Sequence, residues 1–154
     1  MITAREWRRD EYVVSSDPAR LQLDVIHAFL VRSYWAKDVP REVIARSIEG
    51  SIAFGLYRGE DQVGFARVIS DQATFAYVAD VFVLPPQRRQ GLARWMMECI
   101  LATPELQGLR RWLLVTRDAH ALYRSVGFSP VSRPEGFMEI SRHDLYRSAP
   151  ASES

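Results

Sequence analysis

The hydrophobic positions of this chain follow two periods, which predict a mixed order of strands and helices. After Gly91, apolar residues recur at the three- and four-residue spacing of one helix face, and Thr103-Pro104 ends that helix. Short apolar runs between turn residues are typical of strands. Helices are predicted over 18–35, 41–49, 92–102 and 118–125, and strands over 12–14, 52–57, 63–69, 74–84, 111–116 and 137–140.

Polar residues, prolines and glycines mark the ends of these elements. Asp17 and Pro18 have the residue types of an N-cap and a first helical position, and Asp118 is a candidate cap for the last helix. Gly50 and Gly127 follow helical segments, where glycines commonly end a helix. Several helix boundaries are therefore predicted from residue type as well as from periodicity.

The element order is β-α-α-β-β-β-α-β-α-β, which combines two kinds of connection. Strands that follow one another directly predict antiparallel hairpins, including one around Gly59-Glu60-Asp61. Strand–helix alternation in the second half predicts a parallel crossover. We therefore predict an α/β fold, a mixed α+β sandwich, as a single domain over residues 1–147 with a disordered tail over 148–154.

Composition narrows the class of protein. The 154 residues carry a formal net charge of +1, which argues against a nucleic-acid partner held by a large basic face. No apolar run approaches the ~20 residues that span a membrane, and the charged N-terminus lacks the apolar core of a signal peptide. Cys99 is the single cysteine, so we expect a reducing, cytoplasmic location. His27, His120 and His143 show no ligand spacing, and we expect no metal site.

The segment between the long strand and the next helix has the residues of an anion-binding turn. Arg88, Arg89 and Arg94 surround the start of the helix, where unpaired N–H groups and the helix dipole already favour negative charge. Gly91 lets the backbone approach a ligand closely or adopt a positive φ. Because three arginines at a helix N-terminus are electrostatically unfavourable, we prefer a phosphorylated ligand over a solvated basic cap.

Two segments resemble motifs of the GNAT superfamily of N-acetyltransferases. Val83-Leu84-Pro85 followed by Arg88 to Ala93 resembles the acetyl-CoA-binding motif, although Arg89 stands where many members have Gly. Asp118 to Phe128 resembles the later Leu-Tyr-x-x-x-Gly-Phe motif. The resemblance implies the GNAT fold, a central mixed sheet of about six or seven strands flanked by helices.

The resemblance also implies how acetyl-CoA, the expected co-substrate, is held. Strands 74–84 and 111–116 would splay apart, and the pantetheine arm would lie in the gap. The basic turn would bind the pyrophosphate. Asp118 either bonds the cofactor or only caps its helix, and the cap alone explains it. The implied cofactor-binding residues are Phe82, Val83, Arg88, Arg89, Gln90, Gly91, Leu92, Ala93, Asp118 and Tyr123.

Acetyl transfer to an amine needs an acid, an oxyanion donor and a base. Tyr123 stands where the family carries its acid, and a phenol of pKa about 10 stays protonated at neutral pH; the alternative is a packing tyrosine. By the resemblance, the Val83 N–H, with Phe82 beside it, would contact the thioester carbonyl. Asp80 is a carboxylate in an apolar strand, and it is a candidate base, a holder of a cationic amine, or a structural partner of Arg67.

Aromatic residues are the candidates for the acceptor site. Tyr34 and Trp35 end the first long helix, beside the loop that borders the acceptor site in the family, although Trp35 can equally be a core residue. Tyr77 has the same strand parity as Val83, so we expect both on one face of the strand. Together with Asp80, these aromatics suit a cationic amine.

We therefore expect an acetyl-CoA-dependent N-acetyltransferase that acts by direct attack in a ternary complex, with a primary amine of a small molecule as acceptor. Two other functions stay open. One is an acyl-CoA-binding regulatory module without turnover, and the other is a protein acetyltransferase acting on Lys or an N-terminal amine. Many family members dimerise, so a homodimer is compatible with the resemblance. We expect no nucleic-acid or membrane partner.

Overall fold

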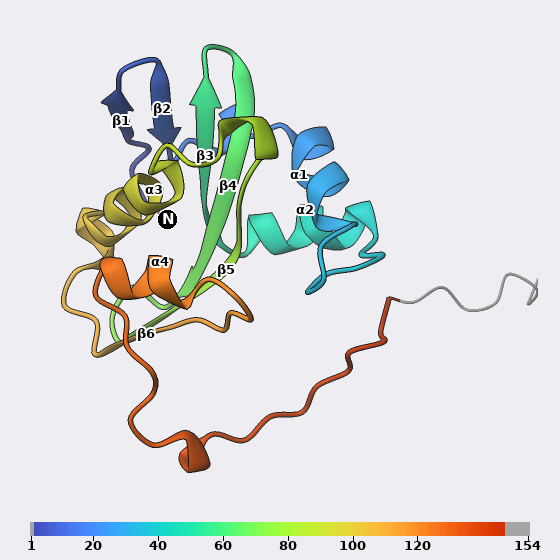
Figure 1. The fold of residues 1–154 in the computed structure, drawn as a ribbon, viewed down its shortest axis with the longest axis vertical. Coiled ribbons are helices and arrows are strands. Elements are labelled where there is room, and N and C mark those ends of the chain that lie inside the picture. Colours follow the sequence, from blue (N-terminus) through green and yellow to red (C-terminus); the bar gives the residue numbers. More distant parts are fainter. Residues whose placement is uncertain (1, 147–154) are drawn as a thin grey trace, which may run out of the picture.

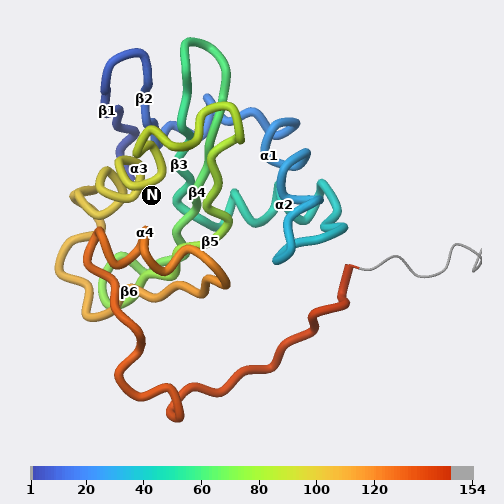
Figure 2. Tube along the Cα trace, in the orientation of Figure 1, coloured from blue at the N-terminus to red at the C-terminus, as the bar shows by residue number. Residues whose placement is uncertain are grey.

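The computed structural model describes residues 2–146, and the tail predicted over 148–154 lies outside the described residues. Six strands form one sheet and lie in it in the order of the sequence (Figure 1, Figure 2). The strands are β1 (Glu6–Arg9), β2 (Tyr12–Ser15), β3 (Ile52–Arg58), β4 (Asp61–Ser70), β5 (Phe75–Val83) and β6 (Arg111–Leu113). The helices of this part of the chain are α1 (Leu23–Leu30), α2 (Arg41–Glu49), α3 (Leu92–Leu101) and α4 (His120–Ser125).

The sheet is mixed, as the element order predicts. Strands β1 to β5 pair antiparallel with their neighbours, and β5 pairs in parallel with β6. The parallel pair is connected through α3, as strands that run in the same direction require a crossover. Helices α3 and α4 pack on one face of the sheet, and α1 and α2 pack on the other (Figure 1). This layering is the predicted mixed α+β sandwich.

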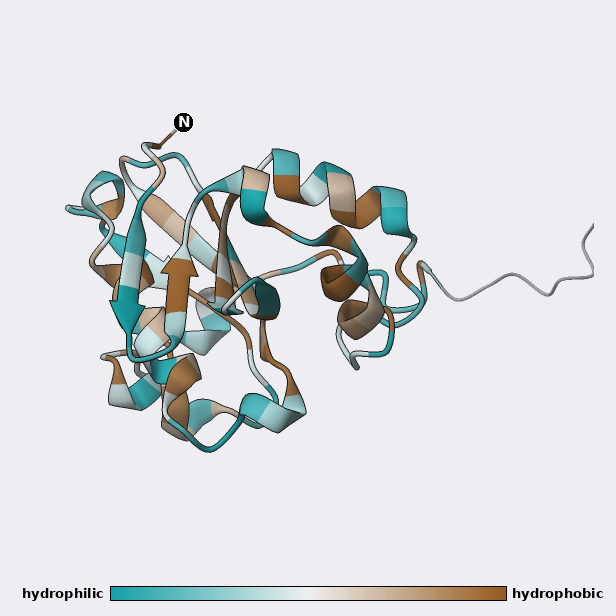
Figure 3. Ribbon diagram, turned by 90° about the horizontal axis from the view of Figure 1, so that it is seen from above, coloured by the Kyte–Doolittle hydropathy of each residue, from teal (hydrophilic) through white to brown (hydrophobic). Residues whose placement is uncertain are grey.

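Two hydrophobic clusters hold the helices to the two faces, because successive strand residues point to opposite sides. On the α3 face, Phe54, Val68 and Met96 are completely buried. On the face of α1 and α2, Ile26 and Phe65 are completely buried. Figure 3 shows hydrophobic and hydrophilic residues alternating along the helices, as expected for helices with one buried side.

The bounds of α2 and α3 agree with the sequence prediction. Helix α2 ends at Glu49, directly before Gly50, and α3 begins directly after Gly91. In both helices a glycine stands where the apolar stripe ends or begins, so the helix boundary does not depend on distant contacts. Within residues 2–146, no helix is long and apolar enough to cross a membrane.

The single helix predicted over 18–35 is wrong in extent. Pro18–Arg20 forms a separate 3₁₀ turn that Asp17 caps, and α1 ends at Leu30. The Ser33 hydroxyl donates to the Leu30 carbonyl at 2.8 Å. The Ser33 side chain thus satisfies a backbone carbonyl at the end of α1. Tyr34 and Trp35 follow the helix and lie in a loop.

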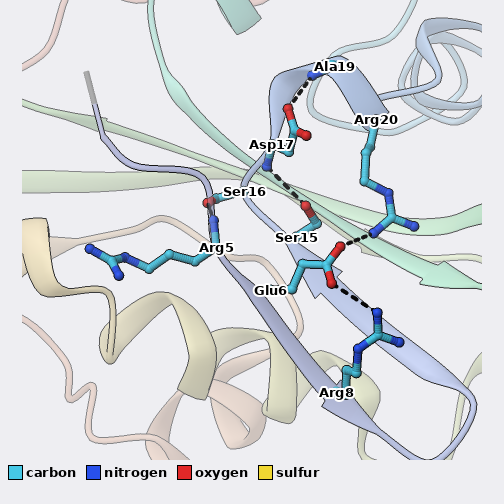
Figure 4. Close-up of polar contacts among 8 residues, drawn as sticks. All are labelled: Arg5, Glu6, Arg8, Ser15, Ser16, Asp17, Ala19 and Arg20. Carbon is cyan, nitrogen blue, oxygen red and sulfur yellow. Dashed lines mark hydrogen bonds and ion pairs between the residues drawn. The ribbon is translucent and has the colours of Figure 1, made fainter.

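Strand β1 was not predicted from the sequence. Its Glu-Trp-Arg-Arg segment lacks the apolar pattern of a strand, because only Trp7 packs against the core. The strand pairs along its whole length with β2, and Glu6 accepts hydrogen bonds from Arg8 and Arg20 at 3.1 and 2.8 Å (Figure 4). Backbone pairing, more than burial, holds this edge strand in place.

The last strand, predicted over 137–140, is wrong. Every residue from 129 to 145 is exposed, and this segment, which we call the C-terminal arm, runs away from the sheet (Figure 1). Strand β6 is also shorter than the predicted 111–116 and pairs, among the described strands, with β5 alone. The apolar run at 137–140 has a strand-like composition, but no described strand lies beside it to complete a ladder.

Candidate active site

The basic turn and the N-terminus of α3 form a small pocket. Gly91 has φ +74°, so the backbone turns there as glycine allows, and Arg89 also has a positive φ of +68°. The pocket brings the unpaired N–H groups of the first helical turn and several arginine charges to one place. Its volume is about 140 Å³, and it is lined by Val83, Gln87, Arg88, Arg89, Gly91, Leu92, Ala93, Arg94 and Leu122.

Side-chain hydrogen bonds hold this turn in place. The Tyr12 hydroxyl, on β2, donates to Gln87 Oε1 at 2.6 Å, and Arg88 Nε donates to the Val83 carbonyl at 2.8 Å. Gln90, one of the predicted cofactor residues, donates to the Gln87 carbonyl and is not among the residues that line the pocket. Sequence reasoning missed Tyr12 and Gln87, because the two lie 75 positions apart and no local pattern connects them.

Strand β5 carries a bulge at Asp80. Phe65 of β4 pairs with Phe82, whereas Arg67, two positions on, pairs with Ala79, so β5 has one extra residue at this point. Asp80 adopts a positive φ of +58°, which is uncommon for a residue with a side chain. An extra residue in one strand turns every later side chain to the opposite face.

The bulge corrects the predicted face of Tyr77. Tyr77 pairs with Ile69, on the β4 face that also carries Arg67. Val83, beyond the bulge, lies instead in the cluster on the α3 face, so equal parity does not put the two residues on one side. Burial raises the pKa of Tyr77 and the Asp80 charge raises it further, whereas Arg67 lowers it. Tyr77 therefore shares its surroundings with Asp80 and Arg67.

Strands β5 and β6 separate beyond a short ladder. The ladder ends at Tyr77 and Leu113, whereas β5 continues to Val83. In the described part of the chain, residues 78–83 therefore have β4 on one side and no paired strand on the other. This opening agrees with the splay that the family resemblance implies.

Tyr123 is buried on α4 and borders the segment that follows β6. Its ring packs edge-on against Phe128, with the centroids 5.9 Å apart. Burial raises the pKa of Tyr123 to about 12, and the nearby Tyr34 adds to this increase. The hydroxyl is therefore protonated throughout the neutral range, which is the state that a general acid needs.

The Asp80 carboxylate has partners from two other elements. Arg67 Nε, on β4, donates to Oδ2 at 2.6 Å, and Trp35 Nε1 donates to Oδ1 at 2.8 Å. The Asp80 side chain is only 8% exposed. The partnership with Arg67, which the sequence left open, is thus present, and it is joined by a contact with Trp35 that the sequence did not indicate.

The loop between α1 and α2 meets the loop that follows β6. The backbone N–H of Arg117 donates to the Tyr34 hydroxyl at 3.1 Å, and the Arg117 guanidinium lies 3.8 Å from the centroid of the Tyr34 ring. Tyr34 packs edge-on against Trp35, and both aromatics are exposed. Trp35 is therefore not a core residue, and the pair borders the candidate site. Sequence reasoning missed Arg117, which lies 83 positions from Tyr34.

Asp118 does not cap α4, and that expectation is wrong. Ala119 occupies the cap position, so Asp118 lies one residue too early for its carboxylate to bond the first turn. The Ala119 N–H donates instead to Thr116 Oγ1 at 3.0 Å. The Asp118 carboxylate is exposed and lies 3.9 Å from Arg117. Its alternative role as a cofactor ligand stays a prediction.

Comparison with known proteins shows what this fold and site resemble. The family model for the acetyltransferase (GNAT) domain matches residues 49–130. A Gibberella zeae protein named as an acetyltransferase is 34% identical over 161 residues, which cover 89% of this chain and 90% of that protein. The crystal structure of a GNAT-family acetyltransferase from Xanthomonas campestris pv. campestris matches with a TM-score of 0.86 and 46% identity, over 89% of this chain and 97% of that chain. A GNAT acetyltransferase from Elizabethkingia anophelis with acetyl-CoA bound shares the fold at a TM-score of 0.63 and 11% identity, over 85% and 88% of the two chains.

The chain therefore belongs to the GNAT acetyltransferase family and is an acetyltransferase of the GNAT type. The predicted family and fold class are confirmed. The region that matches the family model contains the bulged strand β5, the pocket at α3 and the helix that carries Tyr123. These parts of the candidate site therefore lie in the region that the family model matches, whereas Tyr34 and Trp35 precede it.

Proposed function

We propose that this enzyme transfers the acetyl group of acetyl-CoA to the primary amine of a small molecule, by direct attack in a ternary complex. The observation that carries the proposal is the position of α4 beside both parts of the site. Leu122 lines the pocket at α3, and the adjacent Tyr123 borders the segment after β6. An arginine-lined pocket, which suits an anion, and a protonated phenol thus lie next to one opening between strands.

The residues at the opening suit acetyl-CoA, which supplies an activated thioester when it is bound. Leu92, Ala93 and Arg94 begin α3, so their N–H groups have no partners within the helix and can donate to phosphate oxygens. Arg88 and Arg89 line the same pocket and add positive charge. The unpaired edge of β5 offers backbone groups to an extended, amide-containing arm.

The backbone N–H of Val83 is the proposed oxyanion donor. The next N–H, that of Leu84, donates to the Val63 carbonyl on β4 at 2.8 Å. Because successive N–H groups of an extended chain point to opposite edges, the Val83 N–H is directed toward the edge where β6 has separated. Phe82, beside it, is buried on the other face of the sheet and fixes this part of the strand. A donor of this kind contributes about 3 kcal/mol to transition-state stabilisation.

Tyr123 is the proposed general acid. Its raised pKa keeps a proton on the hydroxyl at neutral pH, so the hydroxyl can protonate the departing thiolate. The alternative role of packing remains compatible with this one, because the ring contacts Phe128 while the hydroxyl sits at the end of the side chain.

Tyr34, Trp35, Tyr77 and Asp80 are the proposed acceptor-binding residues. The exposed ring of Trp35 offers cation–π surface to an alkylammonium group, whereas the Tyr34 ring already holds the Arg117 guanidinium and borders the site beside it. Asp80 is the proposed base and the charge that attracts the amine. Each of its oxygens accepts one hydrogen bond and keeps a further lone pair, so a water can pass the amine proton to it.

A protein acceptor with a Lys or N-terminal amine is the second candidate. The contact of Tyr34 with Arg117 joins the two loops at this end of the site, which leaves less room for a polypeptide and favours a small amine. We also propose a cytoplasmic location, which suits the buried free thiol of Cys99.

Thiol release from acetyl-CoA in the presence of single amines tests the proposal. The set contains alkyl monoamines, diamines, amino acids and peptides with Lys or free N-terminal amines, and mass spectrometry identifies the acetylated product. We expect amine-dependent release with higher kcat/KM for small amines than for peptides. Preference for peptides would select the second candidate. Absence of amine-dependent release, in a protein that binds acetyl-CoA by calorimetry, would overturn transfer to amines.

A further inference from the structure

Arg67, the ion-pair partner of Asp80, has hydrogen-bond donors that the protein does not use. Its Nε donates to Asp80 Oδ2 at 2.6 Å, and its Nη1 donates to the Ser51 hydroxyl at 3.1 Å. Nη2 donates to no residue between 2 and 146. A guanidinium carries five N–H donors, of which two are used here, so three remain for a ligand.

The unused donors of Arg67 can be reached from solvent. Within residues 2–146, the buried side-chain atoms that lack a hydrogen-bond partner are Arg5 Nε, the Tyr57 hydroxyl and Glu105 Oε1. Arg67 Nη2 lacks a partner and is not among these buried atoms, so it is in contact with solvent. The Arg67 side chain as a whole is only 17% exposed. A ligand bond to Nη2 would therefore form in a partly desolvated place, where charge-assisted hydrogen bonds are strong.

The direction of the Arg67 guanidinium is fixed from two sides. The Ser51 hydroxyl that accepts from Nη1 donates in turn to the Ser47 carbonyl, near the end of α2, at 2.6 Å. The Asp80 carboxylate on the other side is itself held by Trp35 Nε1. Because the guanidinium is already ordered, a ligand that binds it does not have to immobilise it.

The ion pair makes a bare cation a poor match for this place. Asp80 attracts an alkylammonium group, whereas Arg67, in direct contact with the same carboxylate, repels it. A molecule that carries an amine and a carboxylate close together meets both charges favourably. Its ammonium group would face Asp80, and its carboxylate would accept from the unused donors of Arg67. Because the two protein charges touch, the two ligand charges must also be close, as they are on one carbon atom.

We propose that the acceptor is an α-amino acid, and that Arg67 binds its carboxylate while Asp80 faces its amine. This inference rests on the proposed transfer of the acetyl group to a small amine and narrows the class of substrate. The Trp35 ring, exposed beside Asp80, offers apolar surface to the side chain of the amino acid. A lysine side chain within a polypeptide has no free carboxylate beside its amine, so the same arrangement disfavours a protein acceptor.

Matched acceptors test the proposal on the wild-type enzyme by thiol release. Leucine and phenylalanine are compared with isoamylamine and phenethylamine, which lack only the carboxyl group, and with the two methyl esters, which lack its charge. The decarboxylated amines are more basic than the amino acids and the esters are less basic, so basicity alone cannot produce a preference over both. We expect kcat/KM to be about 10- to 100-fold higher for the amino acids than for either analogue.

Two other results of this comparison would have different meanings. Equal or higher kcat/KM for the decarboxylated amines would overturn the amino-acid acceptor and leave transfer to small amines standing. Absence of thiol release with every amine, in a protein that binds acetyl-CoA, would overturn the proposed function and this inference with it.

Arg67→Lys tests whether the preference comes from this residue. Lysine keeps the positive charge that pairs with Asp80 but lacks the planar fork that bonds two partners at once. The kcat/KM for the amino acids should fall about tenfold, through KM, and that for the decarboxylated amines should stay within about twofold of the wild type. Arg46→Lys, at an exposed position of α2, is the matched control and should keep the wild-type preference. An unchanged preference in Arg67→Lys, including equal losses for both kinds of acceptor, would overturn the role of Arg67.

Discussion

Trp35 Nε1 donates a hydrogen bond to Asp80 Oδ1 at 2.8 Å and thereby ties the loop after α1 to the bulge of β5. Arg67 engages the other carboxylate oxygen, so two donors hold a residue whose φ is positive. A backbone in this region persists only where its surroundings hold it. The bulge, the Asp80–Arg67 ion pair and Trp35 therefore form one structural unit.

Replacing Asp80 with Asn should affect both stability and acceptor binding. Asn keeps the shape but leaves the partly buried Arg67 guanidinium without a carboxylate, which costs about 3 kcal/mol of the free energy of unfolding. We also expect the KM for the amine to rise more than the KM for acetyl-CoA. Urea unfolding and steady-state kinetics measure the two effects.

Trp35→Phe is the matched variant, because it removes the N–H donor and keeps the ion pair. It should cost only about 1 kcal/mol of unfolding free energy and still raise the KM for the amine. Unchanged stability and unchanged kinetics in Asp80→Asn would contradict this account of the unit. A pH–rate profile that loses its acidic limb only in Asp80→Asn would identify the carboxylate as the base.

Gly91→Ala should weaken acetyl-CoA binding by about tenfold, or roughly 1.4 kcal/mol. The reason is the φ of +74° at Gly91, which an alanine adopts at a cost of about 1–2 kcal/mol. A change of the backbone that relieves this strain would move the amide groups of the pocket. Gly59, with φ +61° in the turn between β3 and β4, is the control. Gly59→Ala should lower stability similarly and leave the calorimetric Kd unchanged. Equal Kd values for the two variants would count against the pocket as the anion site.

Stability should fall in alkaline solution. Burial raises the pKa values of Tyr57, Cys99 and Tyr123 to about 12. Because these folded-state values exceed the unfolded ones, the folded protein holds more protons at high pH. The stability that Cys99 confers is complete below about pH 8, and that of the two tyrosines below about pH 9, because the unfolded pKa values are about 8.5 and about 10. It is lost as the pH rises toward about 12, by up to about 1.4 kcal/mol per pH unit for each group. Urea unfolding at pH values from 8 to about 11 measures this, and a flat profile would contradict it.

Thr116→Val should destabilise α4 by about 1 kcal/mol, because it removes the hydroxyl that accepts from the Ala119 N–H. Asp118→Ala removes an exposed carboxylate that is not the cap and should change the free energy of unfolding by less than about 0.5 kcal/mol. Denaturant unfolding of both variants measures the difference. A larger loss of unfolding free energy for Asp118→Ala than for Thr116→Val would show that Asp118, and not Thr116, caps the start of α4.

Local signals predict those parts of the fold that depend on local chemistry. Gly50 and Gly91 lie at the observed ends of helices, and the hairpin around Gly59 joins β3 to β4. The basic turn and the Leu-Tyr motif were sufficient to predict the family, because the residues that define each motif are adjacent in sequence.

The parts that the sequence did not predict depend on distant contacts. The bulge at Asp80 is defined by the register of β5 with β4. The sequence of β5 alone therefore does not show that Tyr77 and Val83 lie on opposite faces. Trp35 meets Asp80 across 45 positions, and Tyr12 meets Gln87 across 75. The apolar run at 137–140 has strand composition, but a strand also needs a partner, which composition does not provide.

The kcat of Tyr123→Phe at saturating acetyl-CoA and amine tests the central claim most directly. The change removes only the hydroxyl, so the ring still packs against Phe128 and the affinity for acetyl-CoA should stay within about twofold of the wild type. If Tyr123 protonates the thiolate, kcat should fall by about 10²- to 10⁴-fold. A wild-type kcat in a folded variant that binds acetyl-CoA normally would contradict the role of Tyr123 as the acid.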